Sequence, residues 1–184
     1  TCWLDRNLGA SAFATAYNHS DSYGDLFQWG RLDDGHQSRN SSTTTAISLN
    51  NNPGHSNFIK VSSSSADWLN TSNNSLWQGV NGINNPCPSG WRIPILSEYL
   101  DEGTSWTPQD YIGAVASPLK WSLAGIRNFD GTAPQHAGTH TWYWSSTLNG
   151  AEACYMWFYQ GGTGAYSSYT GRGHGMSVRC IKDS

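Results

Sequence analysis

Aromatic side chains dominate the apolar content of this chain, and they limit what its core can be. The chain has ten Trp, nine Tyr and five Phe, whereas Leu, Ile and Val are scarce and apolar residues make up only 37% of the sequence. Aromatic rings bury a large area per residue, so they compensate for the missing aliphatic side chains. A chain of 184 residues can bury roughly 70% of its unfolded surface, and we predict a single domain over residues 1–184.

Charged residues are scarce, which limits the classes of partner. They make up 12% of the chain, against about 25% in an average protein. The net charge is −3 and no basic run is present, so nucleic-acid binding is not expected. No stretch approaches the ~20 apolar residues of a membrane span. A surface of Ser, Thr, Asn, Gly and Gln suits a virion, extracellular or cell-surface setting. The chain begins at Thr1 without Met, so we expect a segment of a longer protein.

The four cysteines are Cys2, Cys87, Cys154 and Cys180. They allow three complete pairings, and sequence alone does not choose among them. No CxxC motif and no zinc-finger spacing of Cys and His is present, which favours structural disulfides over a metal site. We predict a disulfide between Cys87 and Cys180, because both lie in segments that look structurally fixed, and a free thiol at Cys154.

Residues 32–85 form a loop-rich insertion. Runs such as SSTTT, NNNPGH and NTSNN are built from Asn, Ser, Gly and Pro, which favour turns. Loop chemistry over about fifty residues is unusual within one domain. Short apolar anchors interrupt it, among them Trp68 and Trp77, which would be costly to leave in water. We therefore expect a long functional loop or an insertion that aromatic residues hold in place, and not a disordered linker.

The other segments predict an α+β domain with a small, mostly antiparallel sheet, one or two short helices and long loops. Ser97 is a suitable N-cap for a helix that ends at about Glu102, before Gly103. Ser22–Arg31 is interpreted as a short helix or a buried strand. Four further segments are predicted to be strands: Pro118–Arg127, Thr139–Ser145, Ala153–Tyr159 and Ser177–Lys182. A fifth strand is expected to start within Cys2–Leu8.

Residues 142–180 combine two kinds of sequence. YWSST and SVRC look structurally fixed, whereas the GGTGAYSSYTGRGHG run between them has neither a helical nor a strand period. Tyr, Ser and Gly are enriched in binding loops, because Tyr offers a large contact area with few rotors and Ser and Gly adapt to the ligand. We interpret this region as a rigid frame around a ligand-contacting surface.

The segment Ala153–Tyr159 must face two ways if it is a strand. Met156 and Phe158 share one face with Cys154 and suit a core, so Tyr155, Trp157 and Tyr159 would stand together on the outer face. An outward row of Tyr and Trp is a good anchor set for a ligand. The alternative is burial on both faces, as in a sandwich. Tyr166–Thr170 has no hydrophobic period and is expected to be a surface loop.

No pattern typical of catalysis is present. The acid pairs Asp33-Asp34 and Asp101-Glu102 are adjacent residues, whereas glycosidases hold two carboxylates about 5–10 Å apart across a cleft. His136 and His140 are separated by Gly138 and Thr139, which favours a solvated hairpin over a metal-binding helix. No GxSxG motif is present. We expect no enzyme, no catalytic metal and no cofactor.

Structural calcium is the exception that the sequence allows. Calcium prefers oxygen ligands from flexible turns, and the Asp- and Asn-rich turns offer them, although such residues are usually turn formers. The candidate ligands are Asp33, Asp34, Asn128 and Asp130.

Several segments together resemble the Fibrobacter succinogenes major paralogous domain, a family grouped with C-type lectin-like folds. The segments are CWLDRNLGA, YGDLFQWGR, NNPCPSGWRIPILSEY, SPLKWSLAGIR, YWSST and GMSVRCIKD, spread over nearly the whole chain. The RIP…EY segment is also distantly similar to formylglycine-generating enzymes. Those enzymes use paired cysteines close together, whereas Cys154 and Cys180 are far apart here and no second Cys lies near either.

A second resemblance is narrower. The YWSST segment, the filling after it and the final SVRC resemble the variable proteins of diversity-generating retroelements, in which error-prone copying rewrites selected codons near the C-terminus. The resemblance implies a constant frame of Trp144, Ser145, Ser146, Ala153, Met156, Phe158, Arg172, Gly175, Ser177, Val178 and Arg179. It implies a variable filling of Leu148, Gly150, Ala151, Cys154, Tyr155, Trp157, Tyr159, Tyr166–Thr170, Gly173 and His174.

These resemblances imply a non-enzymatic receptor-binding or adhesin domain of C-type lectin-like fold at a phage tail tip or a cell surface. The implied ligand is a host cell-surface protein or glycan, and tail proteins of this type are commonly homotrimers within a fibre. The alternatives are a bacterial surface module that binds polysaccharide and, less favoured, a formylglycine-generating-enzyme-like oxidase. The expected contact residues are Trp142, Tyr155, Trp157, Tyr159, Tyr166, Tyr169, Thr170 and His174.

Overall fold

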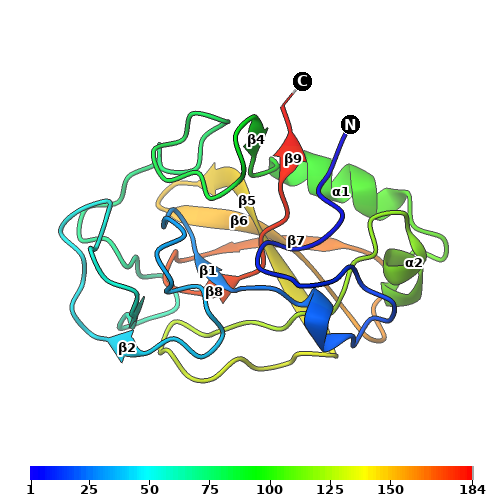
Figure 1. Cartoon of the computed structure of the whole chain (residues 1–184), viewed down its shortest axis with the longest axis horizontal. Coiled ribbons are helices and arrows are strands. Elements are labelled where there is room, and N and C mark those ends of the chain that lie inside the picture. The colour runs from blue at the N-terminus through cyan, green and yellow to red at the C-terminus, as the bar shows by residue number, and fades with distance from the viewer. Residues whose placement is uncertain (184) are drawn as a thin grey trace.

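The computed structural model describes residues 1–183 and shows a small α+β protein with mostly antiparallel sheets and few helices (Figure 1). The chain ends lie beside one another at the top of that view, next to β4 and β9. The elements in chain order are η1 (Ser20–Ser22), β1 (Phe27–Gln28), β2 (Thr43–Thr44), β3 (Phe58–Ile59), β4 (Trp91–Arg92), α1 (Leu96–Thr104), α2 (Tyr111–Ala116), β5 (His140–Asn149), β6 (Glu152–Tyr159), β7 (Tyr166–Thr170), β8 (Gly175–Met176) and β9 (Ile181–Lys182).

The main sheet has the strand order β5-β6-β7 and is antiparallel throughout. β5 and β6 form a hairpin that turns at Gly150, whose positive φ of 62° suits a tight turn. The strands expected at Thr139–Ser145 and Ala153–Tyr159 are confirmed, and the first extends to Asn149. Three two-stranded ladders surround this sheet, of which only β2-β3 is parallel.

Two clusters of buried apolar side chains lie on the two faces of the main sheet. One includes Trp144 and Ala153 and continues into the loop-rich region. The other includes Tyr143, Met156 and Phe158 and packs under α1. Because neighbouring residues of a strand point to opposite faces, a single hairpin supplies both clusters.

The first helix begins at Leu96 and extends past the expected end. The Glu98 side chain, and not Ser97, caps it, by accepting a hydrogen bond from the Ile95 N–H (2.9 Å). The expected stop before Gly103 is wrong because this glycine lies inside the helix. A Cβ at Gly103 would lie 2.6 Å from the Cβ of Ala165, so its missing side chain allows close packing near the start of β7.

The loop-rich region is mostly irregular, as expected, and tryptophans hold it in place. Trp68 and Trp77 are fully buried. Their indole N–H groups, like that of Trp144, donate to backbone carbonyls in one short segment, residues 27–31, which we call the hub segment. The bonds run from Trp144 to Phe27 (2.8 Å), from Trp68 to Trp29 (2.7 Å) and from Trp77 to Arg31 (3.2 Å).

Arginine side chains lie inside this core against aromatic rings. Each of four guanidinium groups lies over a ring of a residue distant in sequence, so its charge is stabilised by the electrons of the ring as well as by hydrogen bonds. The pairs are Arg31 on Trp68 (5.6 Å), Arg127 on Phe58 (4.4 Å), Arg172 on Trp29 (4.4 Å) and Arg179 on Trp121 (4.3 Å).

A disulfide joins Cys87 to Cys180, as predicted, across 93 residues of chain. It lies next to the β4-β9 ladder, in which Arg92 pairs with Ile181. Cys154 is a free thiol, also as predicted, and Cys2 is the second one.

Several expected strands differ from the structure. Pro118–Arg127 forms no regular strand: residues 121–127 are all buried, but only residues 125–127 pair with other segments, through single bridges to three different partners. Ser177–Lys182 is regular only at β9. Cys2–Leu8 runs beside it through the bonds Leu4 N–H to Cys180 C=O (3.0 Å) and Leu8 N–H to Val178 C=O (2.9 Å).

Tyr166–Thr170 is strand β7 and not the expected surface loop. Its sequence lacks a hydrophobic period because it pairs on one side only and much of its surface faces solvent. Within residues 1–183 no helix is long and apolar enough to cross a membrane.

His36 is fully buried and held by two hydrogen bonds. The backbone N–H of Gln28 donates to Nε2 (3.0 Å), so Nδ1 carries the proton and donates to Asp34 Oδ1 (2.6 Å). Burial lowers the pKa of His36 to about 4, although the bond to Asp34 opposes that shift. Protonating Nε2 would break the bond from Gln28 in β1.

The facing of β6 predicts how core truncation affects stability. Phe158→Ala removes a ring that is 1% exposed and packs on Trp106 (4.9 Å between ring centroids), so we expect a loss of about 3–5 kcal/mol in the free energy of unfolding. The matched control Tyr159→Ala, one residue along on the other face, should cost less than about 1 kcal/mol. Urea unfolding measures both, and equal losses would contradict the assigned facing.

The burial of neutral His36 predicts an acid-dependent loss of stability. The pKa of His36 is lower in the folded state than the 6.5 of an unfolded chain. The contribution of neutral His36 to the free energy of unfolding is therefore complete above pH 6.5 and is lost as the pH falls toward 4. The loss should be on the order of 3 kcal/mol. Buried His174, whose pKa burial also lowers, adds to the same slope. Urea midpoints for the wild type and His36→Gln should converge on acidification, and parallel curves would contradict this assignment.

Candidate functional site

A row of half-buried aromatic side chains lies on the outer face of the main sheet. We call Trp142, Tyr155, Trp157, Tyr159 and Tyr166 the aromatic face. The strand register places them together, because Trp157 lies opposite Trp142 on β5 and opposite Tyr166 on β7. Directly opposite residues of an antiparallel pair point to the same face. Each of the five keeps part of its surface in solvent.

Three rings of this face, those of Trp142, Trp157 and Tyr159, lie nearly parallel, whereas Tyr166 is tilted by 34° against Trp157. Trp142 and Trp157 stack at 6.4 Å between centroids with 11° between planes, and Trp157 and Tyr159 at 5.4 Å with 14°. Tyr166 completes the set at 5.0 Å from Trp157. Parallel rings at these spacings support one another, so the face is held in one arrangement before any ligand arrives.

The opposite face of β6 is buried, as predicted. Met156 is 0% and Phe158 1% exposed. The outer face is itself buried at one end, where Trp144 and Ala153 lie in the core. Tyr155 packs on Trp144 at 6.0 Å and marks the point at which this face emerges into solvent. The aromatic face therefore continues the buried cluster around Trp144 out to the surface, and its contact with that cluster holds it along one side.

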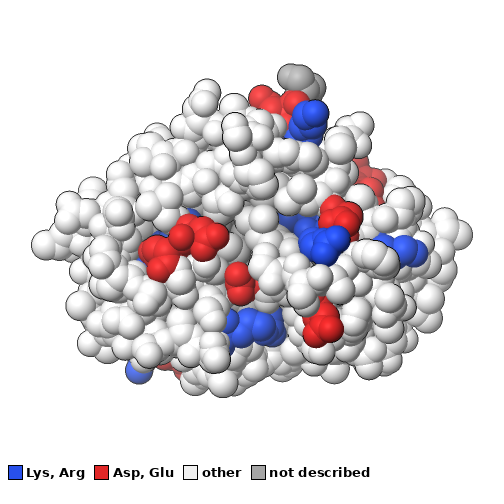
Figure 2. All heavy atoms as spheres, viewed as in Figure 1, with Lys and Arg blue, Asp and Glu red and all other residues white. Residues whose placement is uncertain are grey.

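An open hollow of about 370 Å³ lies on this surface. Its lining contains no charged residue and comes from all three strands of the main sheet: Trp142, Tyr155, Trp157, Tyr166, Ser167 and Ser168. The small side chain of Ser168 lies opposite Tyr155, which leaves space beside that ring. The wider surface is also poor in charge, and Figure 2 shows charged side chains only as scattered groups on the face in view.

Three expected contact residues lie elsewhere. Tyr169 is exposed but pairs with Cys154, so it points to the other face of the sheet. Thr170 shares the outer face but lies beside Ala153, and its hydroxyl donates to the Ser64 carbonyl (3.0 Å).

His174 is the clearest correction among them. It is only 8% exposed and packs against Phe129 at 5.3 Å, so it is not a surface contact residue. The chain turns inward after β7, and Gly173 donates from its N–H to the Ala66 carbonyl (3.1 Å), which carries the next side chain into the interior. Burial lowers the pKa of His174 and keeps its ring neutral.

Two histidines extend the aromatic face where the sequence indicated only a solvated loop. His140 stacks between Trp142 (5.7 Å) and Tyr159 (5.3 Å), and His136 lies 5.1 Å from His140. Burial, followed by the proximity of His136, lowers the pKa of His140. The available signal was the alternation of His140 with Trp142 on one strand, which places both on one face.

Burial separates the expected frame from the expected filling. All eleven frame positions, from Trp144 to Arg179, are buried. The filling is half-buried or exposed except at Cys154, Gly173 and His174. The division proposed from sequence therefore largely matches the inside and outside of the molecule.

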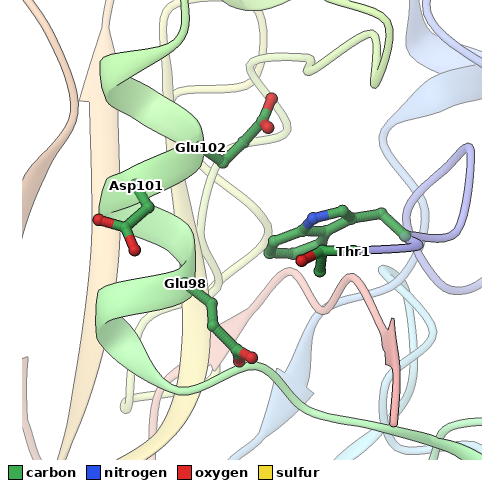
Figure 3. A pocket seen from close by; sticks show the side chains of 5 residues that line it. Thr1, Glu98, Asp101 and Glu102 are labelled. Carbon is green, nitrogen blue, oxygen red and sulfur yellow. The ribbon is translucent and has the colours of Figure 1, made fainter. Parts of the chain in front are cut away.

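Two of the three acidic side chains on α1, those of Glu98 and Glu102, accept hydrogen bonds from protein donors. Glu98, Asp101 and Glu102 line a 240 Å³ pocket beside Thr1 (Figure 3). Arg92 donates two bonds to Glu98 (2.7 and 2.9 Å), which lowers the pKa of that carboxyl. Glu102 accepts the indole N–H groups of Trp106 (3.2 Å) and Trp121 (3.1 Å). Both glutamates therefore serve structural roles.

The Asp-rich turns hold protein groups in the same way. Arg31 donates to Asp34 (2.7 Å), and Asp130 accepts from the N–H of Thr132 (3.0 Å). Within residues 1–183, no three His, Cys, Asp or Glu side chains cluster closely enough to hold a metal ion.

No family model, no curated protein and no solved structure matches the chain.

The two free cysteines should differ sharply in reactivity. Cys2 is exposed, whereas Cys154 is 8% exposed and burial raises the pKa of its thiol. A thiol reagent such as iodoacetamide should label Cys2 rapidly in the native protein and Cys154 only after unfolding in urea. Mass spectrometry locates the label, and Cys2→Ser is the control. Rapid native labelling of Cys154 would show that its face of β6 is open.

Proposed function

We propose that this chain is a non-enzymatic ligand-binding domain of C-type lectin-like fold, and that its aromatic face contacts a protein or glycan on a host cell. The observation that carries the proposal is a row of half-buried rings, three of them stacked, along β6, a strand whose other face is buried. Large rigid rings gain contact area while losing little side-chain entropy, so such a row suits binding.

The agreement between burial and the expected frame supports diversification of this surface. Frame residues such as Trp144, Met156 and Arg179 are buried, where substitution is costly, whereas Trp157 and Tyr159 reach solvent. A diversity-generating retroelement would rewrite the second group and leave the fold intact. In that role the domain sits at a phage tail tip or a cell surface, and in a tail fibre it forms part of a homotrimer.

The chemistry of the aromatic face supports binding over catalysis. An enzyme needs converging ionisable groups in an enclosed pocket. The hollow here is open and lined by rings and hydroxyls. The carboxylates of Glu98 and Glu102 already hold protein donors.

A bacterial polysaccharide-binding module is the second candidate, and the neutral character of the hollow favours it. Aromatic rings pack against the apolar faces of sugars, and a hydroxyl group such as that of Ser168, which shares the face of Tyr155, bonds to sugar hydroxyls. Because the hollow carries no charge, such a glycan would be uncharged where it touches the rings.

Paired substitutions on the two faces test the proposal. Trp157→Ala and Tyr159→Ala should weaken binding at least about tenfold, with a change in melting temperature below about 3 °C. Tyr169→Ala, an exposed tyrosine on the opposite face, is the matched control and should bind normally. Binding is measured on an array of purified bacterial surface polysaccharides and on whole bacterial cells. A large loss of melting temperature would instead identify the rings as core, and unchanged binding would exclude this face.

A further inference from the structure

β7 is an edge strand whose outer backbone groups are free over part of its length. The N–H of Gln160 donates to the Thr139 carbonyl (2.8 Å), which fixes the alternation of the ladder. Residues 153, 155 and 157 of β6 therefore point their backbone N–H and C=O groups toward β7. Residues 166, 168 and 170 of β7 point theirs back toward β6 and pair with them. Ser167 and Tyr169 turn their N–H and C=O groups outward. Among the described residues, no backbone partner meets these groups.

A turn of the loop-rich region covers the edge of the chain just beyond β7. Beyond β7, the Gly171 N–H donates to the Ser64 carbonyl (3.0 Å) and the Gly173 N–H to the Ala66 carbonyl (3.1 Å). Residues 64–66 thus lie beside residues 171–173 without forming a ladder with them. The approach is so close that a Cβ at Gly171 would lie 2.3 Å from the carbonyl carbon of Ser65. These backbone bonds begin at Gly171, just after β7 ends at Thr170, and leave the outer backbone groups of Ser167 and Tyr169 unpaired.

The open part of the edge lacks the features that normally block strand pairing. Such features are Lys or other charges, proline, and a bulge that twists the edge away. Residues 161–171 contain no charged residue and no proline, and the β6-β7 register is continuous. Ser167, Ser168 and Tyr169 are exposed. An unprotected edge beside a binding surface is consistent with use by a ligand.

We propose that the outer edge of β7 is a docking site for an extended, uncharged segment of a protein ligand, which adds a strand to the main sheet. The inference rests on the proposed function and narrows its ligand class to a protein. The backbone of the ligand pairs with Ser167 and Tyr169. Its residue opposite Ser168 points to the outer face, so a large apolar side chain there reaches the hollow between Tyr155 and Trp157.

The short length of the open edge favours a peptide segment over a second copy of this chain. Residues 64–66 already occupy the edge beside Gly171. The outer edge is therefore open only along β7 itself, over about five residues. Two copies paired edge to edge would each bring their own residues 64–66 to that edge. A peptide in extended form has no such flanking loop.

A defined peptide tests the edge. The probe is the dye-labelled peptide Thr-Val-Thr-Trp-Thr-Val-Thr amide, and its affinity is measured by fluorescence anisotropy. Ser167→Pro removes one outward N–H and keeps the pairing with β6, so affinity should fall about tenfold. Ser167→Ala is the matched control and should bind within about twofold, because it keeps the N–H.

Methylated peptides give a second readout that needs no change in the protein. N-methylation of alternate peptide residues should weaken binding at every second position, where the N–H faces β7, and not at the positions between. Equal effects at all positions, or no binding at about 1 mM peptide, would overturn the proposal. Edge-to-edge dimers in sedimentation, with no peptide binding, would also overturn it and identify a second copy as the occupant.

The two proposals fail in different ways. If Trp157→Ala weakens peptide binding and Ser167→Pro does not, the aromatic face binds ligands but the edge does not. Loss in Ser167→Pro with a normal circular dichroism spectrum supports the strand addition. Peptide binding that neither substitution changes would contradict both proposals.

Discussion

The rest of the structure depends on how the hub segment, residues 27–31, satisfies buried indole groups. A buried Trp loses the benefit of its apolar surface if its N–H has no acceptor. Here carbonyls of Phe27, Trp29 and Arg31 supply acceptors for three indoles, and two of these belong to the loop-rich region. The indole of Trp29 in turn donates to Ser145 on β5 (2.9 Å). Irregular loops and the main sheet are thereby fixed to one short stretch of backbone.

Burial also explains the position of the aromatic face. Alternation along β5 and β6 sends Tyr143 and Met156 into one core, and it sends Trp142 and Trp157 to the outer face. Near Trp144 the outer face is still core, so the exposed rings begin from a fixed base. The fold therefore sets the positions of these rings. The open edge of β7 adds backbone groups in the same plane.

Periodicity carried most of what the sequence could predict. The facing of Met156 and Phe158, the β5-β6 hairpin and the burial of Trp68 and Trp77 followed from alternation and from the cost of exposing indoles. β7 was missed because an edge strand in solvent needs no apolar period. His174 was misplaced because the inward turn after β7 depends on residues 64–66, more than a hundred positions away. Contacts between segments so distant leave no local pattern.

The disulfide affects how many substitutions the aromatic face can tolerate. Cys87 and Cys180 close a loop of 93 residues that contains both helices and the whole main sheet. Closing a loop of this size lowers the entropy of the unfolded chain and is worth about 4–5 kcal/mol of stability. That reserve exceeds the cost of most single surface substitutions. The covalent loop thus lets the fold tolerate many different side chains on the aromatic face. In a reducing compartment the disulfide would open and this extra stability would be lost.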